Sequence, residues 1–140
     1  MLYVLDTNIC QLALAKHNLI LERLARADAE TDTIATTIIS LDEAVSGWLP
    51  LCHDGKRLDK RAWAYGQLLE TFTFYRRQLV LPFTPEAAAL LARLKKNFQH
   101  IGLGDLSIAA IALSVNATVV TRNVVDFERV PDLRIKDWTK

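Results

Sequence analysis

The chain of 140 residues lacks several features on which whole classes of protein depend. Two cysteines are too few for a disulfide scaffold, and Cys10 and Cys52 do not form a metal-type pair. Glycine and proline are too scarce for a fibrous or disordered chain. No apolar run approaches the ~18 residues of a transmembrane helix, and no positive stretch precedes an apolar one at the N-terminus. We therefore expect a globular, cytoplasmic protein with no membrane association.

Net charge is also nearly absent, at +1, but charge is unevenly distributed. Residues 51–100 contain nine Lys and Arg against four Asp and Glu, whereas residues 1–50 contain three against seven. This pattern fits a polyanion-facing surface beside an acidic site, although on charge alone solvated helix faces are the better explanation. The three histidines are scattered and suggest no catalytic pairing.

Apolar stretches of strand length alternate with amphipathic stretches along the chain. We predict strands at 2–5, 33–37, 78–83 and 117–121, with an edge strand at 133–138. We predict helices at 8–16, 18–28, 40–48, about 58–72, 84–98 and 106–115. In the long helix, one apolar face is formed by Leu58, Ala62, Tyr65, Leu69 and Phe72. This alternation predicts one α/β domain over residues 1–140, a three-layer α/β/α sandwich with a mostly parallel sheet of four to five strands.

Four acidic residues follow these predicted strands or begin the helices after them. Asp6 ends the first strand, and Glu43 lies in the first turn of the helix after the second. Asp105 precedes the buried helix at 106–115, and Asp126 follows the fourth strand. Because parallel strands bind ligands at their shared carboxyl edge, we expect all four acids at that edge.

Each acid also has a purely structural explanation. Ser40 and Glu43 match a capping box, and Asp105 is a natural N-cap for the helix after it. Asp6 could cap the following helix in the same way, and Asp126 could close a turn through its own backbone.

Taken together, the acids favour a metal site. Two carboxylates ~4 Å apart repel by roughly 4 kcal/mol at an effective dielectric near 20, so their convergence requires positive charge between them. Mg²⁺ and Mn²⁺ prefer oxygen ligands, activate water, and stabilise the leaving oxygen of a phosphodiester.

Four motifs extend this interpretation: "VLDTNI" (4–9), "SLDEAVSG" (40–47), "GLGDLSIAAIA" (102–112) and "VVTRNVVDFERV" (119–130). In this order and spacing they resemble the PIN-domain ribonucleases, specifically VapC-type toxins of type II toxin–antitoxin systems. The resemblance covers essentially the whole chain and implies a PIN-like α/β/α fold. It also implies Mg²⁺- or Mn²⁺-dependent endoribonuclease activity on tRNA or another structured RNA, in a homodimer inhibited by a small antitoxin that inserts into the acidic groove.

By motif match, the resemblance makes Asp6 and Asp105 the principal metal ligands, with Glu43 completing the cluster directly or through water. Thr7, Asn8, Thr121 and Asn123 become supporting polar groups. Some relatives carry an acid where this chain has Asn123, so the fourth catalytic carboxylate is expected to be Asp126. Candidate RNA-binding residues are Arg122 near the acids and, in the basic segment, Lys56, Arg57, Lys60 and Arg61.

Competing interpretations remain open at this stage. A haloacid-dehalogenase-type phosphotransferase requires a second acid where this chain has Asn8. A receiver-type domain requires a lysine where this chain has Arg122, and a nucleotide-binding domain requires a glycine-rich turn after the first strand. A non-catalytic α/β domain with an acidic pocket is the further alternative.

Overall fold

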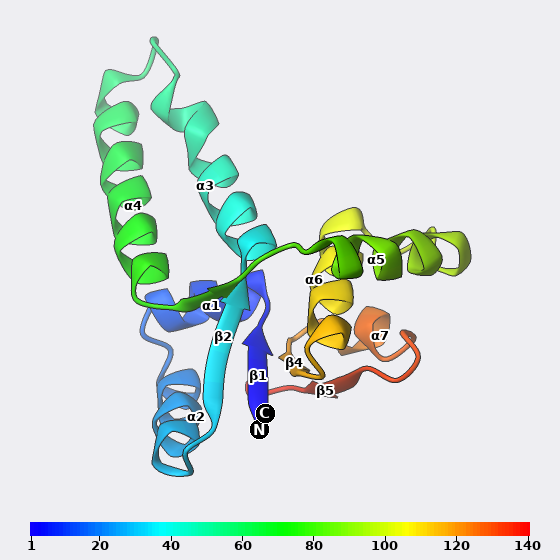
Figure 1. Ribbon diagram of the computed structural model, residues 1–140. Helices are drawn as coiled ribbons and strands as arrows, with labels where there is room; N and C mark the ends of the chain where they lie inside the picture. The colour runs from blue at the N-terminus through cyan, green and yellow to red at the C-terminus, as the bar shows by residue number, and fades with distance from the viewer.

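A fully parallel five-stranded sheet forms the centre of the computed structural model (Figure 1). Its strands are β1 (Leu2–Leu5), β2 (Thr33–Thr37), β3 (Leu79–Leu81), β4 (Thr118–Val120) and β5 (Arg134–Lys136), in the order β3-β2-β1-β4-β5. β1 is central, with β2 on one side and β4 on the other. The direction of strand addition therefore reverses between β1 and β4, which is where open α/β sheets bind ligands.

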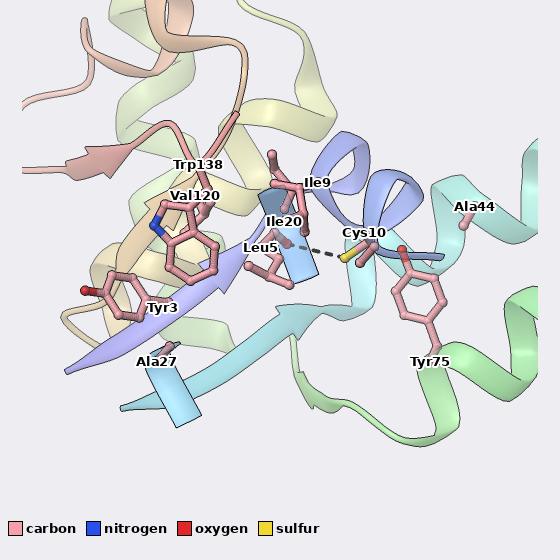
Figure 2. Close-up of a cluster of buried hydrophobic side chains, with 11 residues drawn as sticks. Tyr3, Leu5, Ile9, Cys10, Ile20, Ala27, Ala44, Tyr75, Val120 and Trp138 are labelled. Atoms are coloured by element: carbon pink, nitrogen blue, oxygen red, sulfur yellow. Dashed lines mark hydrogen bonds between the residues drawn. The ribbon is translucent and has the colours of Figure 1, made fainter. Parts of the chain in front are cut away.

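Seven helices surround the sheet: α1 (Thr7–Leu14), α2 (Asn18–Ala29), α3 (Ile38–Cys52), α4 (Leu58–Arg76), α5 (Pro85–Asn97), α6 (Leu103–Ser114) and α7 (Val124–Phe127). Alternate residues of β1 enter two separate cores. Leu5 packs in a cluster with residues of α1 and α2 (Figure 2), whereas Val4 packs on the other face with α6. The predicted three-layer α/β/α fold is confirmed. No helix combines the length and apolarity needed to cross a membrane.

The helices α3 and α6 begin two and three residues earlier than predicted, and this changes the roles of two acids. α3 begins at Ile38 because the Thr37 hydroxyl accepts the Ser40 amide and caps the helix. The capping-box explanation of Ser40 and Glu43 is therefore wrong. α6 begins at Leu103 after Gly102, so Asp105 lies in the first turn and is not its N-cap. Neither Glu43 nor Asp105 is explained by capping.

The α3–α4 hairpin, residues 38–76, extends away from the sheet (Figure 1). α4 packs against α3 through a face that includes Ala64, Thr71 and Tyr75, all buried. The apolar face predicted from the sequence points outward instead: Leu58, Leu69 and Phe72 are 67%, 66% and 57% exposed. Periodicity identified the residues that share this face, but the hairpin extends beyond the sheet, so no core covers it.

Candidate active site

Asp6 is the most buried of the predicted acids, with 3% of its surface exposed. It follows β1 and caps α1: its Oδ1 accepts the Ile9 amide at 3.0 Å. Its Oδ2 accepts the Thr121 hydroxyl, 2.6 Å away at the end of β4. The side chain therefore caps a helix, as one explanation predicted, and also bridges the two strands at the point where strand order reverses.

Asp105 and Asp126 are joined by one amide. The Asn123 side chain donates from Nδ2 to Asp105 Oδ2 and to Asp126 Oδ2, each at 3.1 Å. The Asn123 backbone amide donates to the Thr121 hydroxyl at 2.8 Å. A continuous chain of hydrogen bonds thus runs from Asp6 through Thr121 and Asn123 to the other two carboxylates. Asn123 and Thr121 thus contact the predicted carboxylates directly, and their role as supporting groups stays a prediction.

Glu43 lies on the exposed side of the site and is oriented by Thr7. The Thr7 hydroxyl is 2.7 Å from Glu43 Oε1 and 3.1 Å from the Ser40 hydroxyl oxygen. Gly104 of α6 lies directly against this carboxylate, since a Cβ built on Gly104 would be 2.7 Å from Glu43 Oε2. Glu43 therefore lies beside the N-terminal turn of α6, where Asp105 is found.

The acids act on one another electrostatically. Burial raises the pKa of Asp6, hydrogen bonds from Thr121 and Ile9 oppose the rise, and the charges of Asp105 and Glu43 add to it. Burial also raises the pKa of Asp105, against the Asn123 hydrogen bond, and Glu43 and Asp126 raise it further. Both ion pairs of the molecule lie elsewhere, at the N-terminus with Asp32 and between Arg57 and Asp59. The site therefore concentrates negative charge that no salt bridge offsets.

This negative charge makes the site suitable for a divalent cation that keeps much of its hydration shell, such as Mg²⁺. No three Asp, Glu, His or Cys side chains form a group that could hold one ion together. Mg²⁺ does not require such a group, because proteins usually bind it through one or two carboxylates while it keeps several waters. Asp105 lies close enough to Asp6 for its charge to add to the rise in the Asp6 pKa caused by burial, and Glu43 is on the exposed side of the site, so these are the residues that would hold such an ion.

Other predicted residues lie apart from the acids. Asn8 is exposed and makes no side-chain hydrogen bond within the chain. Arg122 is exposed and forms no salt bridge with the acids. Against the rise from burial, hydrogen bonds from Thr139 and then the charges of Lys140 and Arg122 lower the pKa of Asp137. The basic residues Lys56, Arg57, Lys60 and Arg61 lie beyond the far end of α3 (Figure 1), which is about 14 Å of helix from Glu43. Arg61 is partly engaged there, since its Nε donates to the Cys52 carbonyl at 2.7 Å.

Sequence reasoning missed two residues that shape the site. Ser40 is fully buried and contacts Thr7 and Thr37 within 3.4 Å, beneath Glu43. Gly104 leaves the space that the Glu43 carboxylate occupies. A glycine directly before Asp105 in "GLGD" was the available signal, but its meaning depends on how α3 and α6 approach each other.

Comparisons with known proteins by family profile, by sequence and by structure agree with one another. The PIN domain family profile matches residues 3–133. Ribonuclease VapC2 of Rickettsia felis is 31% identical over the full length of both chains. The tRNA(fMet)-specific endonuclease VapC of Salmonella typhimurium is 30% identical over 97% of each chain. Among solved structures, VapBC2 from Rickettsia felis, bound to a DNA fragment from their promoter, aligns with a TM-score of 0.77 at 30% identity, covering 99% of both chains.

Proposed function

This chain belongs to the PIN-domain family, and on that basis we propose that it is a metal-dependent endoribonuclease acting as the toxin of a toxin–antitoxin pair. The observation that carries the proposal is that Asp6, a buried carboxylate, lies close enough to Asp105 and Glu43 for their charges to add to the rise in its pKa caused by burial, with no salt bridge to any of the three. The ribonuclease names of the similar proteins support the reaction class.

Asp6 and Asp105 would hold a Mg²⁺ or Mn²⁺ ion. When bound, such an ion offsets phosphate charge and makes water more acidic. Thr121 and Asn123 fix the two carboxylates in place through hydrogen bonds of 2.6 and 3.1 Å. Glu43 is exposed and has a free Oε2, so it is placed to accept a proton from the attacking water. Asp126 accepts from the same Asn123 amide as Asp105, and its charge adds to the rise in the Asp105 pKa caused by burial, so it adds negative charge beside the proposed metal ligand.

RNA is the proposed substrate, and transfer RNA the leading candidate within that class, because one similar protein is named for cleavage of tRNA(fMet). Arg122 is the basic residue nearest the acids in sequence and is exposed. The basic residues of the α3–α4 hairpin, including Lys56 and Lys60, are far enough away to contact a second part of a folded RNA. RNA affinity then depends on salt, since these contacts neutralise phosphates.

We propose protein partners as well: a small antitoxin that inserts into the acidic groove, and a second copy of the chain. The outward apolar face of α4 supports partner binding, because soluble monomers rarely leave a large contiguous apolar patch uncovered. Sedimentation of the purified chain should give a dimer, and Leu69→Lys should lower its mass towards the monomer if this face forms the contact.

The ribonuclease proposal is tested with purified protein and a panel of transfer RNAs. Cleavage should require Mg²⁺ or Mn²⁺ and should stop when EDTA is added. Asp105→Asn keeps the size of the side chain and should reduce cleavage more than about 100-fold, since even residues that only orient metal ligands contribute 10–100-fold. Cleavage that continues undiminished in Asp105→Asn would overturn the proposal.

A further inference from the structure

A cavity of about 460 Å³ lies between α1, α3 and α4, next to the acids. Its lining includes Gln11 from α1, Glu43 and Trp48 from α3, and Gln67 and Tyr75 from α4. The volume is within the range of small-molecule sites. Because Glu43 belongs both to this cavity and to the acidic cluster, a ligand in the cavity would be a direct neighbour of a group bound at the acids.

The inner wall of the cavity contains an unsatisfied polar group. Tyr75 is 3% exposed, and its hydroxyl has no hydrogen-bond partner in the chain. Figure 2 shows this hydroxyl directed towards Cys10 and the part of α3 that carries Ala44. Cys10 lines the same cavity, and its thiol donates a hydrogen bond to the Thr36 hydroxyl at 3.3 Å. The Cys10 thiol is its nearest polar neighbour, close enough that each group influences the pKa of the other, so the hydroxyl still has hydrogen-bonding capacity for a group on the cavity side.

The remaining walls combine apolar and uncharged polar groups, which suits a flat ligand with polar edges. Gln11 is exposed and Gln67 is half-buried, and each side-chain amide offers both donors and an acceptor. Trp48 is held edge-to-face against Trp63, with ring centroids 5.3 Å apart and planes at 87°. No Lys or Arg lines the cavity, which makes it unsuitable for a phosphate.

We propose that this cavity binds one unpaired base of the RNA substrate, adjacent to the phosphate that is cleaved. This inference rests on the proposed ribonuclease function and assigns it a specificity site. Proteins that recognise RNA sequence commonly stack splayed-out bases on aromatic rings and bond their edges. Here Trp48 provides the ring, Gln11 and Gln67 bond the base edge, and the Tyr75 hydroxyl bonds the group that enters deepest.

An apolar side chain of a protein partner is the competing occupant. It would fill the same volume, but it would offer no polar group to the buried Tyr75 hydroxyl. Sites that keep buried polar groups select ligands able to pair them. The lining is half hydrophobic, and the buried Tyr75 hydroxyl within it favours an occupant with a polar edge, such as a base, over a wholly apolar side chain.

The test compares Tyr75→Phe and Gln67→Leu with two matched controls outside the cavity, Tyr3→Phe and Gln99→Leu. Substrates are short single-stranded RNAs that vary one base at a time on either side of the cleaved bond, with Mn²⁺ present. The wild type and both controls should prefer one base at one flanking position by at least about 10-fold. Tyr75→Phe and Gln67→Leu should lose most of that preference. An abasic residue at that position should bring the wild type and these two variants to similar rates.

Three results would overturn the inference. If the wild type cleaves RNA and both cavity variants keep its base preference, the cavity is not a base site, although the ribonuclease proposal stands. If the variants weaken antitoxin binding and leave base preference intact, the cavity is a protein-docking site. The third result comes from a measurement that does not depend on cleavage, in which RNA carrying photoreactive thiouridine is cross-linked to the protein in the presence of EDTA. Cross-links to peptides containing Gln67 or Tyr75 support the inference, and cross-links confined to other peptides contradict it.

Discussion

The carboxyl edge of the sheet and the α3–α4 hairpin arrange their charged residues in opposite ways. At the edge, Asp6 is bonded to Thr121, 115 residues away in sequence. In the hairpin, Arg57 pairs with Asp59, its near neighbour, and both are largely exposed. At the edge, the charged side chains are partly buried and are held by tertiary contacts. In the hairpin, they are exposed and pair with near neighbours in the sequence.

This difference separates two kinds of function. Hydrolysis requires carboxylates held in one geometry, so the edge should respond strongly to small changes. Binding of a large charged partner needs only suitably placed positive charge, so the hairpin should respond weakly and in a salt-dependent way.

Asp6→Asn should have the largest effect on cleavage, a loss of more than about 100-fold. The same change should raise the stability of the metal-free protein. Asparagine caps a helix as well as aspartate, so the bond from the Ile9 amide can remain. Ionised Asp6 is costly in the fold, because burial and the neighbouring acids raise its pKa. Thermal unfolding in EDTA at pH 7 measures the effect.

The pH dependence of the stability gain provides a control for the Asp6→Asn prediction. A carboxyl group whose folded pKa is raised stabilises the protein fully below its unfolded pKa of about 3.9, and this contribution is lost as pH rises through the folded value. The stability gain of Asp6→Asn should therefore be absent near pH 3 and present at pH 7. A gain of equal size at both values would show that charge burial is not its cause.

Gly104→Ala should reduce cleavage on the order of 100-fold, because a small misplacement of a catalytic group can cost that much. The new Cβ would lie 2.7 Å from Glu43 Oε2, so the carboxylate must move. Alanine favours a helix over glycine by about 1 kcal/mol, so the fold should remain. Gly66→Ala, in a helix with nothing within 4 Å, is the control and should cleave like the wild type. Equal rates in the two variants would mean that the position of Glu43 is unimportant.

Asn123→Ala should reduce cleavage about 10-fold, the lower limit for residues that orient metal ligands. The change removes both amide bonds, to Asp105 and to Asp126. The loss should appear mainly as a higher midpoint of the Mn²⁺ titration, which is the Mn²⁺ concentration at half-maximal cleavage rate. Asn97→Ala, at the exposed end of α5, should leave that midpoint unchanged. A lower rate with an unaltered midpoint would place Asn123 outside metal binding.

Lys60→Glu in the hairpin should have the smallest effect, a few-fold weaker RNA binding at low salt that disappears as salt rises. Lys95→Glu on α5 makes the same charge change away from the hairpin and serves as the control. Fluorescence anisotropy with labelled RNA at several salt concentrations measures both. Identical salt curves for the two variants would remove the hairpin from RNA binding.

The same comparison explains what the sequence could and could not predict. Asp6 and Asp105 were found because local pattern marks where strands end and helices begin, and in a parallel sheet those places share an edge. The contact of Gly104 with Glu43 was not predictable, since it depends on the approach of two helices about 60 residues apart. The outward face of α4 was also not predictable: a periodic pattern identifies the residues of a face but not what covers it.

The central claim is that Asp6 and Asp105 share a divalent cation at the carboxyl edge of the sheet. Calorimetric titration of the metal-free protein with Mn²⁺ at pH 7 tests it most directly and does not require RNA. The wild type should bind Mn²⁺ at a site that is lost in both Asp6→Asn and Asp105→Asn and kept in Gly66→Ala. Undiminished Mn²⁺ binding in either of the two aspartate variants would contradict the claim.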